Sequence, residues 1–267
     1  WYQFHGDTEK IASDTWCNSS DCLPAAISPD REVHSILVFY PEKVVKLPID
    51  AAFPVLHGKN GEDGTVQGLF EMAGIPLVGC RTMTSALCMD KDRAHKLAHS
   101  AGIKIPASFI LKKNLDMKIA LAQAESLKYP LFVKPVRAGS SYGITKVTDQ
   151  RDLPAAIKLA FQYDDEVIVE ESITGFEVGC AVMGNDRLTV GEVDEIELSD
   201  GFFDFTEKYT LKTSAIHVPA RISKEKTKEI KRTAETIYQA LGCRGFARVD
   251  MFLDSKGEVV FNEVNTI

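Results

Sequence analysis

The fold is decided near the C-terminus by the stretch Ala247-Arg248-Val249-Asp250-Met251-Phe252-Leu253-Asp254-Ser255-Lys256-Gly257-Glu258-Val259-Val260-Phe261-Asn262-Glu263-Val264-Asn265, which predicts a β-hairpin. Two runs of alternating apolar residues flank the turn-forming segment Asp254-Ser255-Lys256-Gly257. Side chains of a strand alternate between its two faces, so Arg248 and Asp250 share one face, as do Glu263 and Asn265. One antiparallel register then pairs Phe252 with Phe261, Asp250 with Glu263 and Arg248 with Asn265.

The pairing of Asp250 with Glu263 has a chemical consequence. Two carboxylates that face each other across a strand pair repel, at a cost of roughly 0.2–1 kcal/mol. A divalent cation removes this cost, because Mg²⁺ binds carboxylate and amide oxygens and keeps positions open for phosphate. Taken alone, the hairpin is compatible with any Mg²⁺ enzyme or with a solvated sheet edge.

Length, charge and hydropathy limit the class of protein. A chain of 267 residues predicts two or three subdomains. The net charge of −7 argues against non-specific nucleic-acid binding, which needs a basic face. No run approaches the ~20 apolar residues of a membrane span, and no signal-peptide pattern is present. The abrupt start at Trp1 and the end two residues after Asn265 lead us to expect a chain truncated at both ends.

The six cysteines are scattered along the chain. Cys17 and Cys22 are close enough in sequence for a disulfide or a metal site, but no second pair completes a zinc site. We expect reduced thiols in a cytoplasmic protein.

Strands and helices alternate through the first part of the chain, which is typical of a parallel α/β domain. The expected strands are residues 35–39, 51–56, 75–79, 107–111, 131–134, 167–170, 177–182 and 189–195. The expected helices are residues 65–73, a long helix from near 84 to just before Gly102, 117–126, 153–162 and 224–241.

A strand ending at Lys134 leads into the small-residue loop 137–143. Backbone N–H groups freed by glycine and serine can surround phosphate oxygens, and a lysine adds charge. The loop is not a Walker loop, because the order G-x-x-x-x-G-K-[ST] is absent. A solvent-exposed hairpin turn is the alternative.

Three further segments have both a functional and a structural interpretation. The link 170–177 suits a purine edge and ribose hydroxyls, or is an ordinary loop. His57, before a glycine-rich loop, lies near a ligand or is a structural histidine. The aromatic and charged segment 202–209 suits a flap that excludes water, or an edge strand.

Taken together, these pieces resemble the D-alanine–D-alanine ligases of the ATP-grasp superfamily, from about residue 50 to the end. The motifs that carry the resemblance are His57-Gly58-Lys59-Asn60-Gly61-Glu62-Asp63-Gly64, Met89-Asp90-Lys91, Lys134-Pro135-Val136-Arg137-Ala138-Gly139-Ser140-Ser141, Lys208-Tyr209, Arg248-Val249-Asp250 and Asn262-Glu263-Val264-Asn265-Thr266. The vancomycin-resistance branch, and its D-alanine–D-serine ligases in particular, is the most similar. The family's N-terminal glycine-rich segment and its C-terminal continuation have no counterpart here.

The resemblance implies an ATP-grasp fold, α/β (α+β) in class, after a parallel α/β N-terminal domain. The implied domains are an incomplete N-terminal domain at 1–88, a central ATP-grasp subdomain at 89–172 and an incomplete C-terminal ATP-grasp subdomain with the metal site at 173–267.

The resemblance also implies roles for individual residues. Those implied for ATP are Lys91, Lys134, Ser140, Ser141, Glu170, Glu171, Ile173, Glu177, Phe202 and Asn262. The lysines would contact phosphates, the serines would lie in the loop over the γ-phosphate, and residues 170–173 would line the adenine hinge. The residues implied for catalysis are Arg248, Ser140, Tyr209, His57 and Lys208. Two Mg²⁺ ions, with Mn²⁺ as the expected substitute, would be held by Asp250, Glu263 and Asn265.

The implied reaction is ATP-dependent ligation of D-alanine to a second D-amino acid through an acyl phosphate, for cell-wall synthesis and vancomycin resistance. D-serine is favoured over D-alanine by overall likeness. Lys208-Tyr209 in the flap indicates an amine nucleophile, because D-lactate-using relatives typically carry histidine there. A homodimer is implied. The alternatives are a housekeeping D-alanine–D-alanine ligase, another carboxylate–amine ligase, or a non-catalytic nucleotide-binding module.

Overall fold

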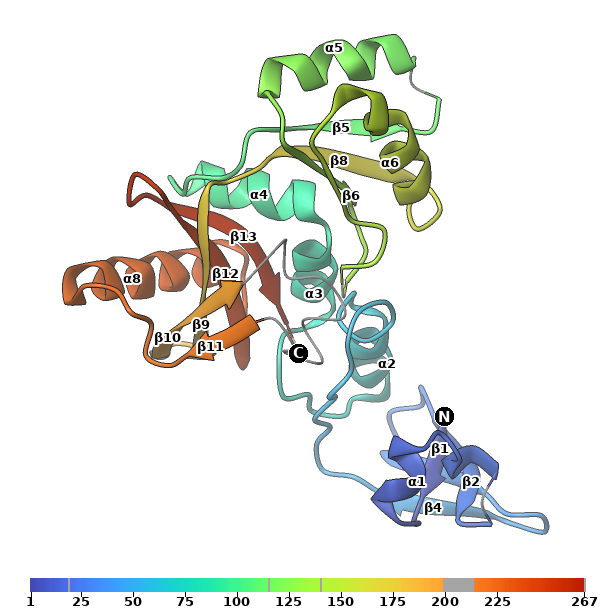
Figure 1. The fold of residues 1–267 in the computed structure, drawn as a ribbon. Coiled ribbons are helices and arrows are strands. Elements are labelled where there is room, and N and C mark those ends of the chain that lie inside the picture. Colours follow the sequence, from blue (N-terminus) through green and yellow to red (C-terminus); the bar gives the residue numbers. More distant parts are fainter. Residues whose placement is uncertain (19, 115, 140, 199–213, 267) are drawn as a thin grey trace. The chain divides into compact units, whose positions relative to one another are not determined.

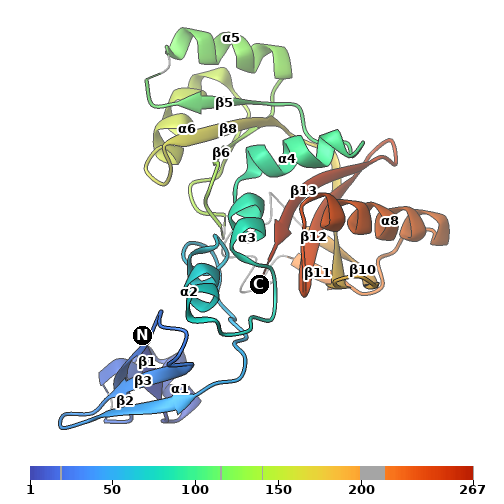
Figure 2. The ribbon, with the colours of Figure 1, turned by 180° about the vertical axis from the view of Figure 1, so that it is seen from behind.

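The computed structural model describes residues 1–266 except 19, 115, 140 and 199–213. The chain forms two compact units (Figure 1, Figure 2). Unit 1 comprises Trp1–Pro54 and Val66–Val78, and unit 2 comprises Val55–Thr65 and Gly79–Ile267. The finer division at residues 88 and 172 stays a prediction.

Unit 1 is built on a four-stranded antiparallel sheet in the order β1-β2-β3-β4. Its elements are β1 (Tyr2–Phe4), α1 (Thr8–Ala12), the 3-10 helix η1 (Trp16–Asn18), β2 (Cys22–Ile27), β3 (Ser35–Phe39), β4 (Val44–Pro48) and α2 (Thr65–Ala73). Helix α2 places Val66, Phe70 and Ala73 in a small core with Ile27 and Ile75. Gly74 follows α2 with a φ of 69°, where glycine avoids steric strain, so the predicted helix end is confirmed.

The predicted parallel sheet and the buried strand at residues 51–56 are wrong. Short links join β2, β3 and β4, and short links connect antiparallel strands, whereas parallel pairs need a crossover. Among the described residues, the parallel pairing here is limited to the isolated bridge between Ala52 and Leu77, which also replaces the strand expected at 75–79. Phe53 and Val55 are exposed, and Pro54 between them has no N–H group for a strand ladder.

Unit 2 contains two antiparallel sheets, each packed against helices (Figure 1). Its elements are α3 (Thr82–Met89), α4 (Lys91–Ser100), β5 (Ser108–Lys112), α5 (Met117–Leu127), β6 (Leu131–Pro135), β7 (Thr145–Val147), η2 (Gln150–Asp152), α6 (Leu153–Ala160), β8 (Glu166–Glu171), β9 (Gly175–Gly184), β10 (Leu188–Leu198), β11 (Ser214–His217), α8 (Lys224–Ala240), β12 (Phe246–Asp254) and β13 (Val259–Asn265). Most of the strands and helices expected in this part of the chain are present within a few residues.

The sheet β5-β8-β6-β7 separates an apolar face from a polar face. Val167 and Val169 of β8 pack with α5 and α6 in one core. Because side chains alternate along a strand, Glu170 of β8 lies on the opposite face, and its register partner Phe132 lies there as well. Lys134, two residues after Phe132, shares this face.

The sheet β11-β10-β9-β12-β13 is divided in the same way. The buried face of α8, which includes Ile230, Ile237 and Tyr238, packs with Val178 of β9 and Val249 of β12. Alternation therefore turns Glu177 of β9, and Arg248, Asp250 and Phe252 of β12, to the face away from α8.

The hairpin of β12 and β13 confirms the two polar pairs predicted from the sequence. Asp250 pairs with Glu263 and Arg248 pairs with Asn265. The predicted pairing of Phe252 with Phe261 is wrong, because a bulge shifts the register and pairs Phe252 with Val260. The bulge leaves Asn262 without a partner on β12, so one extra residue enters β13.

The single long helix expected from near residue 84 to Gly102 is two helices. Asp90 breaks it with an extended ψ of 96°, and its side chain accepts a hydrogen bond from the backbone N–H of Arg93. An aspartate in this position is a typical N-cap, and it makes Lys91 the first residue of α4. All six cysteines are free thiols, as expected.

Candidate active site

The polar faces of the two sheets of unit 2 line one cavity of about 610 Å³. Its walls include many residues for which the family resemblance implies contact with ATP or metal: Lys91, Lys134, Ser141, Glu170, Glu171, Ile173, Glu177, Asn262 and Glu263. Residues from four separate segments of the sequence are thus brought together at one place. Ser140, Phe202, Lys208 and Tyr209 lie outside the described residues, and their predicted roles stay predictions.

A buried ion pair lies at the floor of this cavity. The Nζ atom of Lys134 is 2.6 Å from Oε2 of Glu170, which is only 2% exposed. Burial alone favours the neutral acid, but the charges of Lys134 and His95 hold the pKa of Glu170 below its ordinary value. Glu170 is therefore a carboxylate that compensates Lys134.

His95 completes this cluster and was missed from the sequence. Its Nδ1 atom lies 3.6 Å from Oε1 of Glu170, and its Nε2 atom is 2.7 Å from the backbone oxygen of Asn262. The spacing in the sequence could have predicted it. His95 follows Lys91 by four residues, and residues four apart lie on the same face of a helix. His95 thus connects α4 to both walls of the cavity.

Lys91 lies between the small-residue loop and the hairpin. Its Nζ donates to the backbone oxygen of Ala138 at 2.7 Å and lies 3.9 Å from Oε2 of Glu263. Its backbone N–H donates to the oxygen of Val136 at 3.2 Å. The first turn of α4 is therefore attached to the start of the loop that contains Ser141.

Arg248 and Asp250 form a bidentate pair on the hairpin. Nε and one terminal nitrogen of Arg248 each lie 2.7 Å from a different carboxylate oxygen of Asp250, and Nδ2 of Asn265 donates to Oδ2 of Asp250 at 2.7 Å. Asp250 is 2% exposed, and its charge raises the pKa of Arg248 further above the usual value. The guanidinium group is held in one orientation by this geometry.

The donor atoms of the hairpin fit a hard divalent cation. Asp250 and Glu263 supply carboxylate oxygens and Asn265 an amide oxygen, from neighbouring positions of paired strands. Among the residues that the structure describes, no group of three or more His, Cys, Asp and Glu side chains gathers as a metal site. The hairpin differs from such a group because one of its three donors is an amide.

His57 is exposed and is absent from the cavity lining. The adjacent Gly58 donates its N–H to Oε2 of Glu62 at 2.6 Å and approaches the small-residue loop closely. A Cβ atom on Gly139 would lie 2.9 Å from Cα of Gly58, so the two loops pack backbone against backbone. The role of His57 near the substrates stays a prediction.

Comparison with known proteins assigns both parts of the chain to one family. A family model described as "D-ala D-ala ligase C-terminus" matches residues 97–267, and one described as "D-ala D-ala ligase N-terminus" matches residues 1–80. The vancomycin B-type resistance protein VanB of Enterococcus faecalis is 49% identical over 93% of this chain and 72% of its own length. A D-alanine–D-alanine ligase of Caldicellulosiruptor bescii is 44% identical over 100% of this chain and 74% of its own length.

A solved structure is also similar. The VanG D-Ala:D-Ser ligase of Enterococcus faecalis matches with a TM-score of 0.88 and 60% identity, over 100% of this chain and 77% of that one. None of the helices that the structure describes has the length and apolar character needed to cross a bilayer.

Proposed function

The chain belongs to the D-alanine–D-alanine ligase family, and from this premise we propose that it joins D-alanine to D-serine with ATP, through an acyl phosphate. The product would serve cell-wall precursor synthesis and vancomycin resistance. The observation that carries this proposal is the cavity itself, where two lysines, the small-residue loop and the acidic hairpin meet.

The nucleotide would lie along the wall formed by residues 170–177. Glu171 accepts the backbone N–H of Ala107 at 2.8 Å, which fixes this segment at the cavity edge where adenine would bind. Glu177 would accept the ribose hydroxyls. Lys91 and Lys134 would face the phosphates, because both extend into the cavity from buried positions. Buried ammonium groups interact strongly with phosphate, since water screens them little.

Asp250, Glu263 and Asn265 would hold Mg²⁺, which neutralises charge on a phosphoryl group during its transfer. Arg248 has a different role in this proposal. Its guanidinium, oriented by Asp250, would bind the carboxylate of D-alanine and then the oxyanion that forms when the second amino group attacks. The new amide bond forms as inorganic phosphate leaves.

D-serine as the second substrate is supported by similarity to the solved D-Ala:D-Ser ligase. The runner-up is a D-alanine–D-alanine ligase, supported by similarity to the C. bescii enzyme. The sequence motif Lys208-Tyr209 favours an amine over the hydroxyl group of D-lactate in either case.

The test is phosphate release by the protein at its full natural length, with ATP, Mg²⁺ and D-alanine. D-serine, additional D-alanine and D-lactate are compared as second substrates, and the products are identified by mass. We expect D-alanyl-D-serine to form fastest. Faster D-alanyl-D-alanine would establish the runner-up, and ATP binding without phosphate release would indicate a non-catalytic module.

A further inference from the structure

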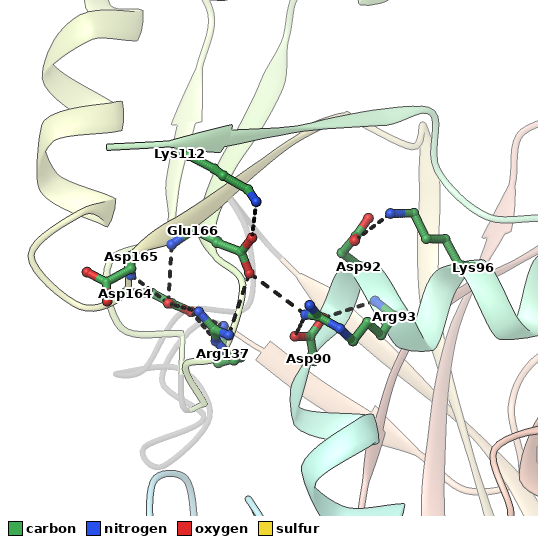
Figure 3. A network of polar contacts seen from close by, with 9 residues as sticks. All are labelled: Asp90, Asp92, Arg93, Lys96, Lys112, Arg137, Asp164, Asp165 and Glu166. Atoms are coloured by element: carbon green, nitrogen blue, oxygen red, sulfur yellow. Dashed lines mark hydrogen bonds and ion pairs between the residues drawn. The ribbon is translucent and has the colours of Figure 1, made fainter. Parts of the chain in front are cut away.

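A polar network begins at the first residue of the small-residue loop (Figure 3). None of its residues lines the cavity just described. At its centre Asp164 holds Arg137, the first residue of the loop 137–143. Oδ2 of Asp164 accepts the backbone N–H of Arg137 at 2.6 Å and its Nε at 3.2 Å, and Oδ1 accepts a terminal nitrogen at 2.7 Å. One carboxylate therefore fixes both the backbone and the side chain of Arg137.

Glu166 links this pair to the helix that carries Lys91. It lies 3.5 Å from Arg137 and 3.8 Å from Arg93, and Figure 3 shows both arginines directed toward it. Arg93 also pairs with Asp90, the N-cap of α4. The backbone oxygen of Glu166 accepts the N–H of Val136 at 3.1 Å. The start of the loop and the first turn of α4 are thus joined by one network.

The network is close in sequence to the predicted phosphate contacts but does not line the cavity. Arg137 directly precedes Ala138, whose oxygen accepts Nζ of Lys91, and Ser141 lies at the cavity wall. Asp164 is almost fully buried at its side chain, whereas Arg137 is partly exposed. Any effect of Asp164 on the reaction is therefore indirect, through the loop or through the turn before β8.

We propose that Asp164 is a positioning residue that fixes the small-residue loop for the phosphates of ATP by holding Arg137. The inference rests on the proposed ligase function. Buried carboxylates with several charge-assisted hydrogen bonds hold their partners more firmly than neutral groups do. Burial disfavours the charged form of Asp164, but the bonds from Arg137 lower its pKa, so the carboxylate is ionised at neutral pH.

Asp164→Asn separates this role from a structural one. Oδ1 also accepts the backbone N–H groups of Asp165 at 2.6 Å and Glu166 at 3.2 Å, and asparagine retains this oxygen. The amide NH₂ then replaces Oδ2 and opposes the N–H of Arg137, donor against donor. The turn before β8 is preserved, and of the three bonds to Arg137 only the one from its terminal nitrogen to Oδ1 remains, so the hold on the backbone of the loop is lost. Asp165→Asn is the matched control, because that exposed carboxylate pairs with Lys113 at the surface.

We expect Asp164→Asn to raise the KM for ATP about tenfold, a ratio that corresponds to the loss of one hydrogen bond to a charged group, and to leave the KM for D-alanine within about twofold of the wild-type value. Asp165→Asn should leave both values unchanged. Adding Arg137→Ala to Asp164→Asn should cost no more than Arg137→Ala alone, because the two residues act as a unit. Melting temperatures of all variants establish that each is folded, and Arg137→Ala alone provides the test if Asp164→Asn is not.

An unchanged KM for ATP in Asp164→Asn overturns the inference, as do additive effects in the double variant. A lower kcat with both KM values unchanged also overturns it, because this is the signature of a smaller folded fraction. These results differ from failure of the proposed function, in which the wild-type protein itself forms no dipeptide.

Discussion

Glu170→Gln removes the charge that compensates Lys134 inside unit 2. The pair is 2.6 Å apart, and the side chains of Lys134 and Glu170 are 11% and 2% exposed, so little water reaches the site of the lost carboxylate. Breaking a buried ion pair from one side costs about 3–5 kcal/mol. This cost has an upper limit, because a lysine left without its partner can lose its proton. Deprotonating a free lysine side chain at pH 7 costs about 4.6 kcal/mol. We expect a loss of unfolding free energy between about 3 and 4.6 kcal/mol.

The loss of unfolding free energy in Glu170→Gln should become smaller as the pH falls. The pKa of Glu170 in the folded protein lies below its ordinary value of 4.5, because Lys134 and His95 outweigh the effect of burial. A carboxyl group of this kind stabilises the fold above its unfolded pKa, and the contribution disappears as pH falls through the folded pKa. The difference between wild type and variant is therefore full at pH 7 and shrinks as pH falls below about 4.5.

Urea unfolding at pH 7, 5 and 4 measures this difference. Asp165→Asn, at an exposed carboxylate, is the control and should change stability little at each pH. A loss below about 1 kcal/mol at pH 7 would refute the buried-charge reasoning, since it is the size expected of a surface pair. So would a loss that stays constant from pH 7 to pH 4.

Three further variants test other parts of the site and core. Asp250→Asn should lower the rate of phosphate release about 10²–10³-fold, and excess Mg²⁺ should restore part of that rate. If neither the rate nor its dependence on Mg²⁺ changes in this assay, the metal proposal is contradicted. Gly139→Ala should raise the KM for ATP severalfold, because its Cβ would lie 2.9 Å from Cα of Gly58, whereas Gly191→Ala, with its nearest contact at 3.4 Å, should not. Tyr238→Phe should lower the free energy of unfolding by about 1 kcal/mol in urea without changing kcat, because its hydroxyl donates a hydrogen bond of 2.8 Å inside the core; a changed kcat would argue against a purely structural role.

The polar pairs of the hairpin could be predicted because they depend on strand alternation alone. The bulge at Asn262 could not, since an extra residue leaves the pattern of apolar residues nearly unchanged. Its effect is functional. Alternation would place Asn262 and Glu263 on opposite faces, yet both line the cavity.

Contacts between segments that are distant in the chain could not be predicted from the sequence either. The role of Glu170 as a counter-charge depends on where Lys134 and His95 lie. For Glu170, only a position in the adenine hinge was predicted. Asp164 gave no signal, because its partner Arg137 is 27 residues away. The helix break at Asp90 could have been predicted, because an aspartate before a helical run is a known N-cap signal.

The fixed lysines of the cavity bear on the cost of binding. Nζ of Lys91 is held by the oxygen of Ala138, and Nζ of Lys134 is held by Glu170. Immobilising a flexible side chain during association costs about 0.5–1.5 kcal/mol. Folding has already ordered both ammonium groups, so an anionic ligand meets a preorganised surface and retains that much more of its interaction energy as affinity.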